Sequence, residues 1–211
     1  MKTEELIDLL AQDTAPAFAF RTLFLAATLA GVAIAGLVFS TAIGVRPDFE
    51  RALRTGRFLF KFVITVPLAL GTVGLLLSLA RPGADIGLWR WRVLASPALL
   101  LGAVASELWL LPSATWRGQM IGHNGRLCLT LIPLLSLGPL ACLLAVLRRG
   151  APAHPGRAGV AAGLTAAAIA ATFYAANCDD DSPLFVAFWY PMAFAVMAAA
   201  GYGLGQRLLR W

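Results

Sequence analysis

The most reactive side chains of this sequence are three cysteines: Cys128, Cys142 and Cys178. His123 lies five residues before Cys128. Three consecutive carboxylates follow Cys178: Asp179, Asp180 and Asp181. Two thiols that come together can form a structural disulfide, a redox-switchable pair, or part of a site for a soft or transition metal ion of the copper, zinc or cadmium type. Because the sequence contains no Cys-x-x-Cys or His-x-x-His spacing, all three uses remain open.

Six long apolar segments must position these side chains. The chain is 59% hydrophobic and 13% charged, about half the charged fraction of a soluble domain. About 20 mainly apolar residues are needed to cross a bilayer as a helix. Six segments meet this length: Leu23–Gly44, Phe58–Ala80, Val93–Leu111, Leu127–Leu147, Gly159–Ala176 and Leu184–Leu204. The sequence therefore predicts an all-α, polytopic membrane protein, a bundle of six transmembrane helices with little mass outside the bilayer.

The distribution of Lys and Arg predicts that both chain ends face the cytoplasm. This orientation places ten basic residues inside and seven outside, and the loop after the fifth span has none. Cys128 and Cys178 then meet at the outer face of a bacterial inner membrane, in an oxidising compartment. Cys142 lies about 21 Å deeper in the fourth span, at about 1.5 Å per residue, and is expected to be a packing residue.

Glu107 is the one acidic residue inside a predicted span. An ionisable residue in such a place is a hypothesis for function, and Glu107 would lie within about one turn of the outer end of the third span. The alternative is a carboxylate that reaches the outer interface, or one paired with Arg117 or Arg126.

Two pairs of glycines at a spacing of four residues predict close helix packing: Gly159 with Gly163, and Gly201 with Gly205. Packing within one bundle is the favoured interpretation, and a homodimer interface is the second.

A short amphipathic helix is predicted before the first span. Thr3 is its expected N-cap, and Glu4 and Glu5 occupy the first turn, where the helix dipole favours anions. Leu6, Leu9 and Leu10 share one face, with Ile7 alongside, opposite Glu5, Asp8 and Gln12, and Asp13 ends the segment. Such a short helix needs a surface to lie on. It either lies on the membrane, where anionic headgroups repel it, or docks on a basic partner protein.

Several activities are not expected. The two histidines, His123 and His154, fall in loops on opposite sides of the bundle and cannot ligate a haem together. The spans lack the buried carboxylates and broken helices of ion-coupled transporters. No nucleophile elbow, zinc-protease motif or phosphate-binding loop is present, so an enzyme is not expected. The basic residues are scattered between apolar segments, which favours contact with membrane lipid and does not suggest direct nucleic-acid binding.

Several blocks of sequence point to one family. They are Met1-Lys2-Thr3-Glu4-Glu5-Leu6-Ile7, Gly122-His123-Asn124-Gly125-Arg126-Leu127-Cys128-Leu129, Leu147-Arg148-Arg149-Gly150-Ala151-Pro152, Tyr174-Ala175-Ala176-Asn177-Cys178-Asp179-Asp180-Asp181-Ser182-Pro183-Leu184-Phe185, Trp189-Tyr190 and Leu208-Leu209-Arg210-Trp211. The block around Cys178 is the most specific. With these blocks the chain resembles, over essentially its whole length, the NrsF family of bacterial inner-membrane anti-sigma factors, which hold an extracytoplasmic-function (ECF) sigma factor.

The resemblance implies a role for each part of the chain. Residues 1–22 would be a cytoplasmic segment that docks the sigma factor, chiefly through residues 3–13, and residues 23–211 would be a six-helix sensor domain. Cys128 and Cys178 would sense heavy metals or oxidants. Asn177 stands where the family leads us to expect a histidine, so a His-Cys ligand pair is in doubt there and His123 is left as the outward imidazole. Two other classes stay open: a small multi-span transporter or metal exporter, and a structural subunit with a static disulfide.

Overall fold

The computed structural model describes residues 17–81 and 87–209, and within these ranges every regular element is a helix. In chain order the elements are α2 (Ala17–Val38), the π-helical turn η1 (Phe39–Ile43), α3 (Phe49–Ala52), α4 (Gly56–Leu79), α5 (Gly87–Leu110), α6 (Ser113–Ile121), α7 (Gly125–Leu147), α8 (Pro155–Ala175) and α9 (Pro183–Leu208). The predicted helix over residues 1–13 lies outside the described residues.

Six of these helical segments are long and apolar enough to cross a membrane, which confirms the predicted bundle of six spans. Their bounds are Phe20–Ile43, Gly56–Leu79, Gly87–Leu110, Ser113–Leu147, Pro155–Ala175 and Pro183–Leu208. The fourth combines α6 and α7. Pro155 and Pro183 each occupy the first turn of a helix, where a missing backbone N–H costs nothing.

The third span begins six residues before its predicted start at Val93. Hydropathy placed the boundary after the last charged residue, but the backbone is already helical from Gly87. The arginines of this first stretch stack on tryptophans, with the Arg90 guanidinium 5.3 Å from the Trp91 ring and that of Arg92 4.7 Å from the Trp89 ring. Such stacking suits an interfacial helix end, because the ring covers the cation while the head stays near water.

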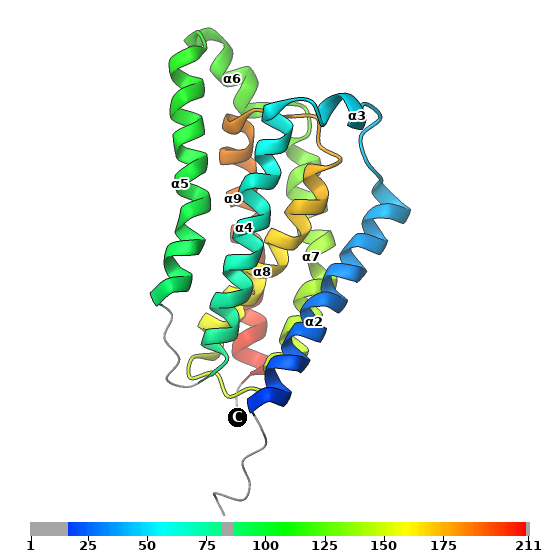
Figure 1. The fold of residues 1–211 in the computed structure, drawn as a ribbon, viewed down its shortest axis with the longest axis vertical. Helices are drawn as coiled ribbons and strands as arrows, with labels where there is room; N and C mark the ends of the chain where they lie inside the picture. Colours follow the sequence, from blue (N-terminus) through cyan, green and yellow to red (C-terminus); the bar gives the residue numbers. More distant parts are fainter. Residues whose placement is uncertain (1–16, 82–86, 210–211) are drawn as a thin grey trace, which may run out of the picture.

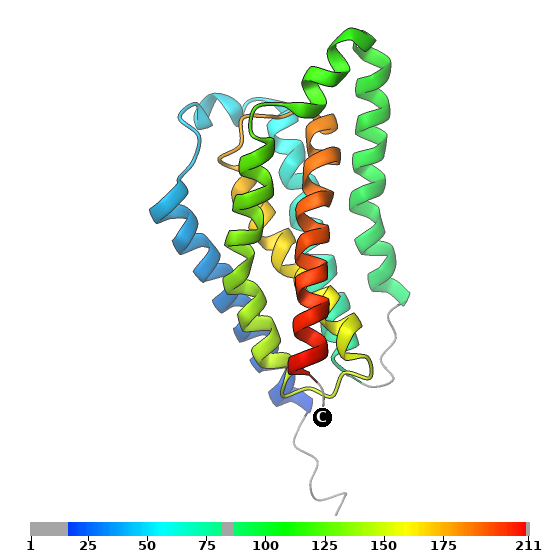
Figure 2. The same cartoon turned by 180° about the vertical axis from the view of Figure 1, so that it is seen from behind.

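The helix α8 lies inside the bundle, and α2 and α5 stand at opposite edges (Figure 1). Seen from behind, α7 and α9 lie side by side in front of α8 (Figure 2). Alanine and glycine make up much of α8, so its neighbours approach its backbone closely. Most of α8 is consequently buried by other helices, unlike the remaining spans.

The two glycine pairs pack against each other between α8 and α9. A Cβ atom added to Gly159 would come 2.1 Å from the carbonyl oxygen of Gly201, and one added to Gly163 would come 2.1 Å from that of Met197. Real Cβ atoms do not approach backbone this closely, so only glycine fits. The prediction of close packing within one bundle is therefore confirmed.

Candidate functional site: two thiols beneath an acidic loop

Cys128 and Cys178 lie at the same end of the bundle, which we call the thiol end. Cys128 is in the first turn of α7, and Cys178 follows α8 in the loop to α9. Both are free thiols and are buried, with 0% and 1% of their surface exposed. Cys142, also a free thiol, is partly buried further along α7.

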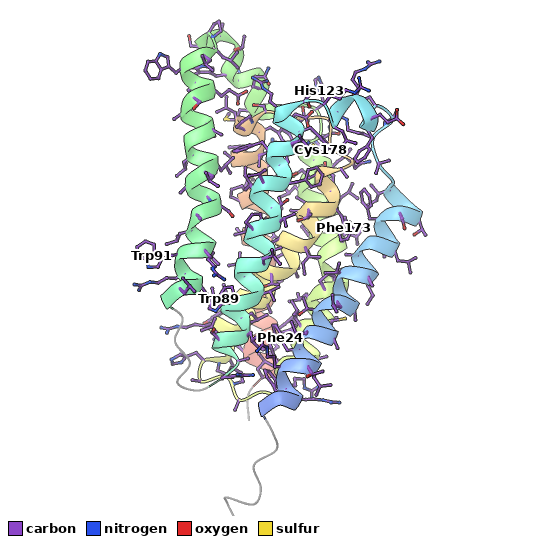
Figure 3. All side chains as sticks on the ribbon, viewed as in Figure 1. Phe24, Trp89, Trp91, His123, Phe173 and Cys178 are labelled. Carbon is purple, nitrogen blue, oxygen red and sulfur yellow. The ribbon has the colours of Figure 1, made fainter. Side chains whose placement is uncertain are left out.

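Residues 178–182, here called the acidic loop, begin with Cys178 and lead into α9; Figure 3 shows Cys178 and His123 at the same end of the bundle. The Tyr174 hydroxyl, on α8, lies against the Cys178 thiol and donates to the carbonyl oxygen of Asn124 at 3.4 Å. Asn177 holds the start of the loop by donating from its amide to the Gly44 carbonyl oxygen at 3.0 Å. Asn177, where a histidine was expected, therefore serves here as a structural bridge to the end of the first span.

Two cations bind the acidic loop from the side of α4 and the α2–α3 connection. The Lys61 ammonium lies 2.5 Å from an Asp181 carboxylate oxygen and donates to the Cys178 carbonyl oxygen at 2.8 Å. Arg46 contacts the other Asp181 oxygen at 2.9 Å and Asp48 at 2.6 Å. Both cations also lie over the face of Phe58, at 5.4 and 5.7 Å from its centroid. Asp181 is thus bridged by two cations.

The hydrogen bonds between Arg46 and Asp48 also shift the pKa values of both groups. They raise the pKa of Arg46 above its usual value, and they lower that of Asp48. Both groups therefore stay ionised at neutral pH, which keeps Arg46 available to Asp181.

Asp180 joins the acidic loop to the turn between α6 and α7. One of its oxygens accepts from the backbone N–H groups of His123, at 2.9 Å, and Asn124, at 2.7 Å. Asp179 accepts from the Asn124 side-chain amide. Gly122 precedes this turn with φ of 58°, and a Cβ there would lie 2.7 Å from the Asp180 carboxylate. The turn that leads into Cys128 is thus held directly by the loop that carries Cys178.

The His123 side chain is not drawn into the cluster. It is 94% exposed, and its Nδ1 lies 3.7 Å from Asp180. In the described ranges, no three His, Cys, Asp or Glu side chains gather in a way that could hold a metal ion. The carboxylates of Asp180 and Asp181 are engaged by N–H donors and by cations, respectively.

Glu107 connects α5 to the acidic loop. It is 4% exposed, and one oxygen accepts from the Ser182 hydroxyl at 2.8 Å and from the Leu184 N–H at 3.1 Å. Its other oxygen lies 3.2 Å from Arg57. The alternative pairing with Arg117 or Arg126 is not found among the described residues, because α4 lies alongside α5 and places Arg57 at the carboxylate. The N-terminus of α9 further favours an anion here.

Burial makes the Cys178 thiol a weak acid. Desolvation raises its pKa to about 11, while the positive charge of Lys61 acts in the opposite direction. Since the thiolate is the reactive form, the closed site keeps Cys178 largely unreactive at neutral pH.

Sequence reasoning missed Lys61, Arg46 and Asn124 as residues of this site. A signal for Lys61 was present, because a lysine inside an apolar span is as unusual as the glutamate at position 107. Arg46 and Asn124 gave no such signal, since they stand in turns where polar residues are ordinary.

Comparison with known proteins links the chain to one group of regulators. The family described as "Negative regulator of sigma F", NrsF, matches residues 10–211. The chain is 35% identical, over 216 aligned positions covering both chains in full, to the probable anti-sigma-F factor NrsF of Azospira oryzae. It is 34% identical, over 220 positions and again in full, to the anti-sigma-F factor NrsF of Caulobacter vibrioides. No solved structure matches the chain significantly.

Proposed function

Since the chain belongs to the NrsF family of negative regulators of sigma F, we propose that it is a membrane-bound anti-sigma factor with a thiol sensor. It sequesters a sigma factor of the ECF type at the bacterial inner membrane and releases it when an oxidant or soft metal ion reaches Cys128 and Cys178. Family membership points to a regulatory role without catalysis.

The observation that carries the sensor proposal is the arrangement of two free, buried thiols beneath one loop. Partners from four parts of the chain hold that loop: Arg46 after η1, Lys61 on α4, Glu107 on α5, and the turn before α7. A chemical change at Cys178 therefore displaces groups attached to several spans at once. The bundle then needs two packings that differ in affinity for the signal, since only such a difference shifts a conformational equilibrium.

Either kind of signal can be written as a balanced step. On oxidation, the two thiols give two electrons and two protons to the oxidant and form one S–S bond. On metal binding, each thiol releases its proton and the two thiolates bind a soft ion of the copper, zinc or cadmium type. Both steps join the start of α7 to the acidic loop more tightly than in the resting state.

For the sigma factor, the proposed docking element is the N-terminal segment, residues 1–22. Its acidic residues, Glu4, Glu5, Asp8 and Asp13, suit a basic surface on the partner. This requires the N-terminus to be cytoplasmic and the thiol end to face the periplasm. The loops support that orientation, because the α7–α8 connection carries Arg148 and Arg149 and the α8–α9 loop has no Lys or Arg.

Co-purification tests the docking proposal. The full chain and a variant lacking residues 1–13, each in native membranes, are used to capture the sigma factor from the same cells. The full chain is expected to retain it and the truncated chain to lose it, while both reach the membrane in equal amounts. Equal retention by the two chains would refute docking through this segment.

A further inference from the structure

The charged residues of the bundle are divided between its two ends. Every carboxylate side chain in the described ranges lies at the thiol end, and so does every ion pair there. The opposite end presents exposed arginines from several helices, among them Arg21 on α2, Arg92 on α5, Arg148 and Arg149 after α7, Arg157 on α8 and Arg207 on α9. Since no described carboxylate lies at this end, the charges of these arginines are not balanced within the described part of the chain.

Three of these arginines, Arg21, Arg148 and Arg149, lie near the start of α2, and we call them the arginine corner. Figure 1 shows the start of α2 and the α7–α8 connection at the same end of the bundle. The two segments are in contact, because a Cβ added to Gly150 would lie 3.1 Å from the Phe20 ring. The arginine corner therefore lies where the chain enters the bundle.

The segment before α2 carries the complementary charge. Residues 3–13 contain no Lys or Arg and four carboxylates, those of Glu4, Glu5, Asp8 and Asp13. These residues lie outside the described ranges, but Asp13 precedes Ala17 by four residues and so lies within roughly 14 Å of the start of α2. A segment tethered this closely meets the corner at a roughly millimolar local concentration. Anionic lipid headgroups, the other candidate for the arginines, repel the segment.

We propose that residues 3–13 dock on the arginine corner of their own bundle, so that the bundle and the sigma factor compete for one acidic segment. This inference deepens the proposed anti-sigma function and rests on it. Two partners that need the same segment exclude each other, so a tighter hold by the corner lowers the affinity for the sigma factor. The competition gives the bundle a means of releasing the sigma factor without touching it.

Two of the helices that reach the corner also reach the acidic loop. The helix α7 carries Cys128 in its first turn and leads at its other end to Arg148. The helix α2 carries Arg21 near its start and continues through η1 towards Arg46, which binds Asp181. A displacement of either helix at the thiol end therefore has a direct structural route to the arginine corner.

Cleavage by a glutamate-specific protease reports whether the segment is docked, because a docked segment is cut at Glu4 and Glu5 only after it opens. The full chain is purified in a neutral detergent, and its cleavage rate is measured by mass spectrometry at low and high salt. In the chain with both Arg148→Gln and Arg149→Gln, the rate at low salt should rise about 2- to 30-fold, as expected for the loss of two exposed ion pairs. High salt should remove the difference between the two chains.

The matched control is Arg51→Gln with Arg54→Gln, which removes two exposed arginines from the thiol end and should leave the rate unchanged. Charge reversal gives an answer even if the variants at the corner do not fold. Asp8→Lys with Asp13→Lys should speed cleavage in the otherwise unmodified bundle. Adding Arg148→Asp and Arg149→Asp to that chain should restore protection.

Bilayer discs that contain phosphatidylglycerol distinguish the segment from lipid headgroups as the occupant of the corner. The unmodified chain should still be cut more slowly there than the chain with Arg148→Gln and Arg149→Gln. Equal rates in the discs would mean that lipid covers the corner, and would overturn the proposal. Equal rates in detergent at low salt, or an equal rise in the Arg51→Gln, Arg54→Gln control, would overturn it as well.

These measurements are made without a sigma factor. A failure here therefore leaves the anti-sigma proposal standing, and a failure of sigma-factor capture leaves this result standing.

Discussion

Replacing Asp180 with asparagine should open the acidic loop. One oxygen of Asp180 accepts two backbone N–H groups, from His123 at 2.9 Å and Asn124 at 2.7 Å, and the residue is 13% exposed. Hydrogen bonds to a charged group contribute about 1.5–3 kcal/mol each, and a neutral acceptor gives roughly half of that. Asp180→Asn should therefore weaken closure of the loop by about 1.5–3 kcal/mol over the two bonds.

Alkylation of Cys178 at pH 8 reports this opening, because a buried thiol reacts only from the open form. Since about 1.4 kcal/mol is a factor of ten, the rate should rise about 10- to 100-fold. Loss of the Asp180 charge acts in the same direction, because that charge raises the pKa of Cys178.

The matched control is Asp179→Asn, the same change in the neighbouring, exposed residue of the loop. Its known contact is with the Asn124 side chain alone, so the rate should change less than about threefold. If the two variants gave the same rate, or Asp180→Asn reacted no faster than the unmodified loop, Asp180 would not hold the thiol segments together.

Three further predictions concern stability, measured as thermal unfolding in detergent. Gly159→Ala should lower the unfolding midpoint, because overpacking against the Gly201 carbonyl costs about 1–3 kcal/mol of stability. Gly203→Ala should leave the midpoint near native, since nothing lies within 4 Å of the added Cβ. Equal effects of the two changes would contradict the close α8–α9 contact. Glu107→Leu should lower stability more than Glu107→Gln does, by about 1–3 kcal/mol, because only glutamine can still accept from the Ser182 hydroxyl and the Leu184 N–H. The reverse order would contradict a stabilising role for these two hydrogen bonds. The pKa of Cys178 is raised from 9.0 to about 11 in the folded chain, so the protonated thiol contributes to stability fully below pH 9, and that contribution is lost as pH rises towards 11. Cys178→Ala should lack this alkaline loss of stability. Identical curves of unfolding midpoint against pH for the two chains would refute the prediction.

The sequence predicts the spans well because membrane thickness is a strong constraint on length. A run of apolar residues must be about 20 long, and Leu127–Leu147 differs from the observed α7 by two residues at its start. The role of the glycine pairs is equally easy to predict, since small residues four apart lie on one face of a helix and let a neighbouring helix approach closely. Both signals are local, so neither requires knowledge of which helices are neighbours.

The contacts of the acidic loop are not local. Lys61 and Cys178 are 117 residues apart, and Arg46 and Asp181 are 135 apart. The sequence suggested Arg117 or Arg126 as a partner for Glu107, whereas the structure pairs it with Arg57. The order of helices around α8 decides the pairing, and hydropathy carries no information about that order.

Release of the sigma factor on thiol modification tests the central claim most directly. Membranes with the full chain and bound sigma factor are treated with a mild oxidant or with a soft metal ion, and the sigma factor that remains bound is measured. Release is expected from the unmodified chain and from Cys142→Ser, but retention by Cys128→Ser and by Cys178→Ser. Equal release from all four chains, or retention by all four under every treatment, would contradict it.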